Sequence, residues 1–181
     1  MNDPRHYFVT DTLRNGTTVT IRAIRPEDKV KLVSAFKNLD RESVYTRFFQ
    51  YVRELTDQDL KRATEIDFDR EVALVVTTNL GDEETIIGTG RYVVFEEADS
   101  GRNAEVAFIV EEDYQGLGVA SRIFRHLVQI GRQNNVSRFT ADVLSGNQAM
   151  LKVFAGSGLP MKQQRDGTVA HVTLSLNETG S

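Results

Sequence analysis

The stretch from Ala104 to Ala120, AEVAFIVEEDYQGLGVA, decides the fold of this chain. It begins with the apolar run Ala104–Val110, which predicts a strand, and it ends in two glycines that lead into an amphipathic helical pattern. A glycine turn before a helix offers clustered backbone N–H groups to an anion, and glycine lets phosphate approach without a Cβ in the way. The stretch therefore predicts a phosphate cradle.

Two other interpretations of the glycines stay open at this point. Two glycines between a strand and a helix often form no more than a tight turn. A dinucleotide-binding Rossmann turn would need a third Gly or Ala where Ser121 stands, and a distal acid, for which Asp142 has roughly the right spacing. However, only one further helical segment follows, so a doubly wound domain has little room to form.

Composition narrows the class of protein. A length of 181 residues with 40% hydrophobic and 27% charged residues predicts one globular domain. A net charge of −4 without a basic block argues against nucleic acid, and no apolar run reaches membrane-spanning length. The start of the chain lacks a signal-peptide pattern, so we expect a cytoplasmic protein. The chain has no cysteine, and its three histidines form no ligand motif, so we expect no metal.

The pattern outward from the decisive stretch predicts an α/β (α+β) domain. A strand is expected over Thr17–Ile24, a helix from Pro26, and another from Thr56, with Asp59 in capping-box spacing. Strands then precede the glycine turn, and a final hairpin turns at Asp166-Gly167. We expect an N-terminal extension over residues 1–16, which contains either a leader or an edge strand, one domain over 17–176, and a tail over 177–181.

This order of elements, together with the motif Gln115-x-x-Gly118-x-Ala120, resembles the GNAT superfamily of N-acetyltransferases. The helix after Asn147, which ends in Gly156-Ser157-Gly158-Leu159, is similar to a second landmark of that family. The resemblance implies a mixed, mostly antiparallel central sheet flanked by helices, with two splayed parallel strands that hold acyl-CoA. It also implies acetyl-CoA as co-substrate and an amine as acceptor.

A closer likeness is to bacterial protein lysine acetyltransferases that act on acyl-CoA synthetases. It lies in Thr17–Asp28, Arg41–Phe49 and Ile66–Glu71. A protein lysine is therefore the leading acceptor, and a small amine or amino acid is the alternative. Two alternative functions belong to other classes of protein. One is a non-catalytic acyl-CoA sensor, and the more remote one is a Rossmann oxidoreductase. Neither nucleic acid nor membrane is an expected partner, and the oligomeric state stays open, with a homodimer as one option.

The resemblance assigns the cofactor-binding residues. The exposed backbone of Phe108, Ile109 and Val110 would pair with the pantetheine arm. Asn147 would hydrogen-bond the carrier near the splay, and a helix N-cap is its other interpretation. The pyrophosphate would be held at the motif glutamine and the N–H groups that follow it, in Gln115, Gly116, Leu117, Gly118, Val119, Ala120 and Ser121.

Glu105 is the candidate catalytic base. It is the only acidic residue of the strand Ala104–Val110, and it matches the position where the resembling lysine acetyltransferases place a catalytic glutamate. A solvated strand-end carboxylate is the alternative. Phe154 stands seven residues after Asn147, where many GNAT enzymes have a tyrosine that protonates the leaving thiolate, so we expect water to protonate it or the thiolate to leave directly. His171 is interpreted as structural, and Ser43, Tyr45, Arg47 and Phe48 as candidate selectors of the acceptor.

Overall fold

The computed structural model describes residues 3–37 and 56–177. Within these ranges the strands join into one eight-stranded sheet with the order β1-β2-β3-β4-β5-β6-β8-β7. The strands are β1 (Phe8–Thr12), β2 (Thr18–Ala23), β3 (Glu71–Leu80), β4 (Glu83–Ala98), β5 (Gly101–Val110), β6 (Val136–Leu144), β7 (Met161–Asp166) and β8 (Val169–Ser175). The helices are α1 (Lys29–Lys37), α3 (Asp57–Thr64), α4 (Val119–Gln133) and α5 (Gln148–Ala155), with short 3-10 turns η1 (Pro4–His6), η2 (Pro26–Asp28) and η3 (Glu112–Tyr114).

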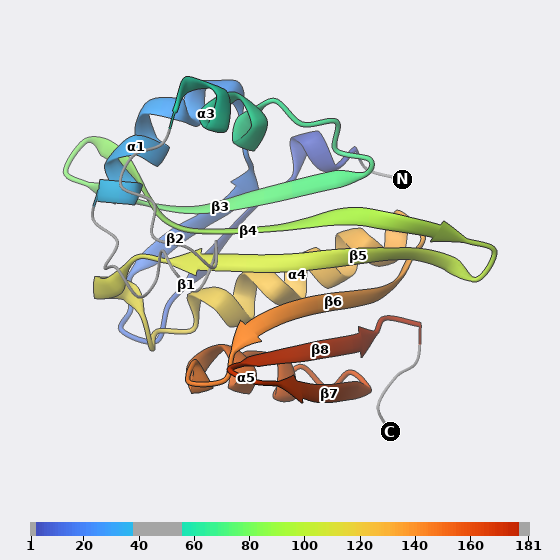
Figure 1. The fold of residues 1–181 in the computed structure, drawn as a ribbon. Coiled ribbons are helices and arrows are strands. Elements are labelled where there is room, and N and C mark those ends of the chain that lie inside the picture. Colours follow the sequence, from blue (N-terminus) through green and yellow to red (C-terminus); the bar gives the residue numbers. More distant parts are fainter. Residues whose placement is uncertain (1–2, 38–55, 178–181) are drawn as a thin grey trace.

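One junction of the sheet differs from all the others. β5 and β6 run parallel, whereas every other pair of neighbouring strands is antiparallel. Figure 1 shows the two parallel strands side by side in the middle of the sheet, with α4 behind them. The mixed, mostly antiparallel sheet predicted from the sequence is therefore confirmed. A doubly wound dinucleotide-binding domain needs a mostly parallel sheet, so that alternative is wrong.

Both ends of the sheet are hairpins. At the first, β1 pairs antiparallel with β2, so the segment read as either a leader or an edge strand contains an edge strand. At the other, β7 and β8 pair from Asp166 and Val169 outward, which confirms the hairpin predicted at Asp166-Gly167. Within the described residues, no helix is both long and apolar enough to cross a membrane.

α4 packs closely against the sheet because two glycines of β4 make room for it. A Cβ built on Gly90 would lie 2.3 Å from Ile123 Cγ2, and one built on Gly88 would lie 2.8 Å from Val119 Cγ1. Real Cβ atoms do not approach other atoms so closely. Ile123 itself is fully buried, in agreement with the predicted apolar side of this helix. The glycines therefore set how deeply α4, and the turn at its N-terminus, lie on the sheet.

α3 lies on the opposite face of the sheet from α4. The hydroxyl of Thr56 accepts from the N–H of Asp59, and the Asp59 carboxylate accepts from the N–H of Thr56, which confirms the predicted capping box. Arg91 of β4 donates to the carbonyl of Ala63 in α3 at 3.2 Å. Because Arg91 is next to Gly90 in the strand, it projects away from the face on which α4 packs. In Figure 1, α1 and α3 lie together at the top of the view.

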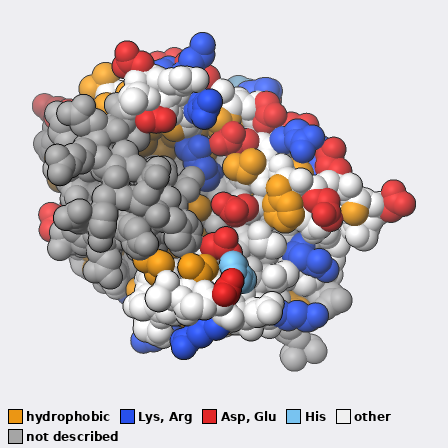
Figure 2. Space-filling view, viewed as in Figure 1, with side chains coloured by type: hydrophobic (Ala, Val, Ile, Leu, Met, Phe, Trp, Pro, Cys, Tyr) orange, Lys and Arg blue, Asp and Glu red, His pale blue; other side chains and the backbone are white. Residues whose placement is uncertain are grey.

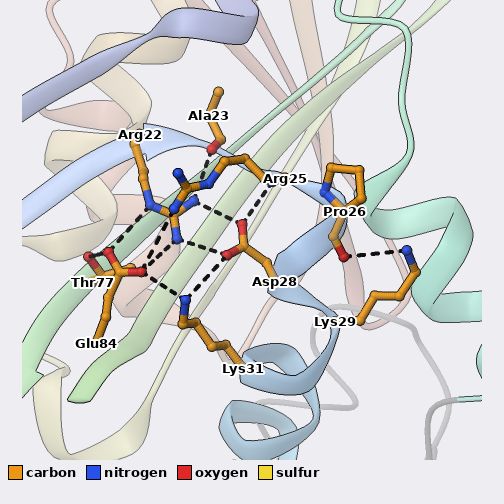
Figure 3. Close-up of polar contacts among 9 residues, drawn as sticks. All are labelled: Arg22, Ala23, Arg25, Pro26, Asp28, Lys29, Lys31, Thr77 and Glu84. Atoms are coloured by element: carbon orange, nitrogen blue, oxygen red, sulfur yellow. Dashed lines mark hydrogen bonds and ion pairs between the residues drawn. The ribbon is translucent and has the colours of Figure 1, made fainter.

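A buried ion-pair network ties the start of α1 to the sheet (Figure 3). Arg22 of β2 makes two hydrogen bonds of 2.8 Å to Asp28, and both side chains are almost fully buried. The same guanidinium donates to Glu84 of β4 at 3.0 Å, and Lys31 of α1 reaches that carboxylate at 3.0 Å. A buried pair of this kind is costly to break, so it fixes the position of the first turn of α1.

The network lowers the pKa of both carboxyl groups. For Glu84 the hydrogen bond from Arg22 is the largest cause, and it outweighs burial, so the pKa falls from 4.5 to about 2. For Asp28 burial is the largest influence and would raise the pKa, but hydrogen bonds from Arg22 and from the backbone N–H of Arg25 outweigh it, and the net pKa is lowered. Both groups are therefore ionised in the folded protein at neutral pH.

Candidate active site

The parallel strands β5 and β6 separate part-way along their length. Their pairing ends at Glu105 and Thr140, although β5 continues to Val110 and β6 continues to Leu144. Beyond this point β5 remains paired with β4 on its far side, and β6 remains paired with β8. A gap therefore opens between two strand edges that face each other. Backbone groups on such edges can pair with an extended ligand.

A cleft of about 1080 Å³ lies at this gap, between the end of β5, α4 and α5. Its volume is slightly above the range of about 300–1,000 Å³ that is usual for ligand pockets. All but one of the residues predicted to bind the cofactor line it: Phe108, Ile109, Val110, Gln115, Gly116, Gly118, Val119, Ala120, Ser121 and Asn147. The exception is Leu117, whose side chain packs against the hydrophobic core. The predicted residues thus come together, and their role in binding stays a prediction.

The glycine turn before α4 adopts the backbone conformation that requires glycine. Gly116 and Gly118 have φ angles of +80° and +91°, and Gly118 is the N-cap of α4. Arg14 donates to the carbonyl of Gly116 at 3.2 Å, and Arg122 donates to the carbonyl of Gly118 at 3.0 Å. The carbonyl and N–H of one trans peptide point in opposite directions, so the next N–H points away from each guanidinium. The two arginines thereby hold the carbonyl groups of this turn, and anion binding at its N–H groups stays a prediction.

Four basic residues that were not predicted from the sequence also line the cleft. They are Arg14, Arg125, Arg132 and Lys152. Their positive charges suit a ligand that carries phosphate groups. Arg125 and Arg132 are seven residues apart in α4, a spacing that places them on one side of a helix and could have been found in the sequence. Arg14 gave no such signal, because it comes from the turn between β1 and β2.

Asn147 has two structural roles. It is the N-cap of α5, and its side-chain oxygen accepts from the backbone N–H of Met150 at 3.2 Å. It also lines the cleft. The helix-cap interpretation is therefore confirmed, and it is compatible with the predicted contact to the carrier.

Phe154 cannot act as an acid at this site. It is 1% exposed and packs in an aromatic cluster, with its ring centroid 5.2 Å from that of Phe124 and 6.0 Å from that of Phe108. Residues with a hydroxyl group that line the cleft include Tyr114, Ser121 and Ser157. The Ser157 hydroxyl donates to the carbonyl of Phe154 at 2.6 Å. The position of the family tyrosine is therefore used for core packing in this chain.

Glu105 lies where β5 and β6 separate, but it projects from the opposite face of the sheet from the cleft. Its neighbours Ala104 and Val106 are buried on the α4 side, and Glu105 is exposed. Within the described residues its carboxylate makes no hydrogen bond or ion pair. The gap between the strands therefore has the cleft on one side and this carboxylate on the other.

Some predicted features lie outside the described residues. These are the stretch of likeness Arg41–Phe49 and, within it, the candidate acceptor-selecting residues Ser43, Tyr45, Arg47 and Phe48. In the part of the chain that the structure describes, no three His, Asp or Glu side chains lie together in a way that could hold a metal ion.

Comparison with known proteins identifies the class. The model of the acetyltransferase (GNAT) family matches residues 38–158, which is more than half of the chain. The chain therefore belongs to the GNAT acetyltransferase family. It is an N-acyltransferase that uses acetyl-CoA as co-substrate.

Three relatives place the chain more closely. It is 31% identical over 157 residues to the acetyltransferase Pat of Mycolicibacterium smegmatis, a match that covers 87% of this chain and 46% of Pat. The chain thus spans about half the length of that relative. It is 26% identical to an acetyltransferase of Pseudomonas aeruginosa, with 86% of this chain and 82% of that protein covered. The crystal structure of the GNAT domain of S. lividans PAT matches with a TM-score of 0.82 and 33% identity, over 93% of this chain and 96% of that domain.

Proposed function

We propose that this chain acetylates the side-chain amine of a protein lysine by direct attack on acetyl-CoA. The likeness of its N-terminal half to bacterial protein lysine acetyltransferases supports this acceptor. The single observation that carries the mechanism is the position of Glu105 at the end of the β5–β6 pairing, across the sheet from the cleft. Acetyl-CoA in the cleft would present its thioester at the gap, and the amine would arrive from the face that carries Glu105.

The reaction needs a base because the acceptor amine is protonated at neutral pH. A lysine with a pKa of ~10.4 is neutral in roughly one molecule in 2,500 at pH 7, which corresponds to about 5 kcal/mol. In the proposed step the ammonium gives one proton to Glu105, and the amine nitrogen then attacks the thioester carbonyl carbon. The carbon–sulfur bond breaks and coenzyme A leaves as the thiolate. The second proton lost by the nitrogen passes to that thiolate through water.

The cofactor side of the site would provide binding and orientation. The strand edge from Phe108 to Val110 would pair with the pantetheine arm, and the turn Gly116–Ser121 would hold the pyrophosphate. Because Phe154 carries no hydroxyl, water is the proton source that we propose for the thiolate. The cytoplasmic location and the oligomeric state stay predictions.

The experiment that tests this function measures release of the coenzyme A thiol from acetyl-CoA. The acceptor panel contains lysine peptides, folded acyl-CoA synthetases and small amines. Because the chain has no cysteine, a thiol reagent reports only the product. We expect release that depends on a protein or peptide lysine and that is lost in Glu105→Gln. The exposed turn variant Asp82→Asn is the matched control and should keep wild-type turnover.

Three other results would change the conclusion. Release with small amines alone would make the chain a small-molecule N-acetyltransferase. Release that persists in Glu105→Gln would remove the assigned base. Binding of coenzyme A without release of its thiol for any acceptor would favour an acyl-CoA sensor. The buried Phe154, which cannot donate a proton, is also compatible with a sensor.

A further inference from the structure

A hydrogen-bonded carboxylate–imidazole pair lies on the exposed face of the sheet, close to Glu105. Asp142 of β6 and His171 of β8 are direct partners in the antiparallel register. His171 Nδ1 lies 2.5 Å from Asp142 Oδ1, and the two side chains are 48% (Asp142) and 46% (His171) exposed. The second ring nitrogen, Nε2, lies 4.0 Å from Asp166 Oδ2, beyond hydrogen-bond distance. His171 was interpreted from the sequence as a structural residue. Because its side chain is about half exposed, however, the ring does not fill the core.

The strand register places this pair beside the gap and on the same face as Glu105. Glu105 pairs with Thr140, and Asp142 is two residues further along β6, which is about 6.6 Å of strand. Side chains alternate between faces, so Thr140 and Asp142 project together. Their neighbours Ala141 and Val143 are buried on the other face. Asp142 thus borders the gap from the β6 side, as Glu105 does from the β5 side.

The rest of this face explains why the pair is accessible. On the β4 part of it, Arg91 donates to the carbonyl of Ala63 in α3. Towards β6 and β8, charged and hydrophobic side chains reach the surface together, as Figure 2 shows to the right of the undescribed residues. Even an exposed salt bridge contributes only about 0–1 kcal/mol to stability, so an exposed side-chain pair of this kind adds little. A contribution to stability therefore does not account for the pairing of Asp142 with His171.

We propose that Asp142 and His171 form the β6–β8 wall of the acceptor site and bind the acceptor as a primary ammonium. This inference rests on the proposed function. An ammonium has three N–H donors, and after one proton passes to Glu105 the amine still has two hydrogens. Asp142 accepts one of them and directs the nitrogen lone pair toward the gap. It takes no proton, and His171 is the positioning residue that holds its carboxylate.

Steady-state kinetics test the proposal. With saturating acetyl-CoA and an acceptor from the panel, Asp142→Asn should raise the acceptor KM at least tenfold, with the Kd for acetyl-CoA and the Tm unchanged. His171→Asn should raise the same KM by a smaller factor, about threefold to fivefold, because it loosens Asp142 without removing it. Asp99→Asn, in the distant turn between β4 and β5, is the charge-matched control. An acceptor KM within twofold of wild type in Asp142→Asn would overturn the proposal.

A second measurement does not depend on turnover. The chain has three histidines, so their ring signals can be followed by NMR and assigned with His171→Asn. Nα-acetyl-lysine methyl ester added to the protein loaded with coenzyme A should shift the His171 signals and leave those of His6 unchanged. The neutral Nε-acetylated compound should shift neither, and Asp142→Asn should abolish the response.

The two measurements separate the inference from the function on which it rests. A His171 response without turnover would support the amine site and reject the proposed function. Turnover with neither a KM effect nor a His171 response would support the function and reject the amine site. Absence of both turnover and response would reject both.

Discussion

The two faces of the sheet at the β5–β6 gap are built in different ways. On the α4 face, most of the cleft comes from two continuous segments, Phe108–Ser121 and Asn147–Leu159. On the opposite face, Glu105, Asp142 and His171 come from three strands, and only the sheet register places them on the same face. The cofactor side is thus encoded locally, and the acceptor side depends on tertiary pairing. Changes on one face should therefore affect one substrate and leave the other unaffected.

The largest expected effect is on the acceptor face. Glu105→Gln should lower kcat by about 10²–10⁴-fold, the usual contribution of a general base. The Kd for acetyl-CoA should stay at the wild-type value, because this carboxylate lies across the sheet from the cleft. Rapid-quench turnover and calorimetric binding measure the two quantities. A parallel loss of cofactor affinity would show that the two faces are not independent.

The buried network on α1 should have a large effect on stability and none on cofactor binding. Asp28→Asn leaves the Arg22 guanidinium without its bidentate partner, so we expect the free energy of unfolding to fall by about 3 kcal/mol. Urea denaturation measures the loss, with Asp82→Asn as the exposed control. Acetyl-CoA affinity measured well below the unfolding transition should be unchanged. A loss below 1 kcal/mol would show that the network does not fix α1.

The same network predicts how stability depends on pH. The folded-state pKa of Glu84 is lowered from 4.5 to about 2, so its stabilising contribution is complete above pH 4.5 and is lost as the pH falls toward 2. The full lowering of this pKa corresponds to about 3 kcal/mol, which solvent screening of the partly exposed carboxylate should reduce to about 2 kcal/mol. Denaturation at a series of pH values should show a shallower decline in Glu84→Gln. If the free energy of unfolding depended on pH in the same way in wild type and variant, Glu84 would not be the source of the pH dependence.

The smallest effect is expected on the cofactor face, from a pair of glycine substitutions. Gly116→Ala and Gly118→Ala both place a Cβ on a backbone with positive φ. At Gly118 the new Cβ would also lie 2.2 Å from Arg122 Nη1, whereas at Gly116 no atom lies within 4 Å. The displaced Arg122 would release the turn carbonyl, so Gly118→Ala should weaken acetyl-CoA binding about tenfold more, or about 1.4 kcal/mol. Calorimetry with acetyl-CoA tests this, and equal losses would mean that Arg122 does not orient the turn.

The sequence was most informative where neighbouring residues act together. The Thr56 capping box, the Asp166-Gly167 hairpin and the helix after Gly118 follow from local hydrogen bonding and periodicity, and the structure confirms them. The cleft residues could be predicted because a single turn and strand end bring most of them together. Arg14 was missed because its contact to Gly116 spans 102 positions of the chain.

The sequence by itself determined the class of fold and the glycine turn, because local backbone preferences and the apolar pattern depend on nearby residues. The tertiary structure alone decided where β5 and β6 separate, on which face Glu105 projects, and that Asp142 pairs with His171. Strand register is set by packing of the whole sheet, and a shift by one residue would turn each side chain to the other face. The chemistry of the acceptor face therefore depends on the register between strands, which cannot be derived from the sequence alone.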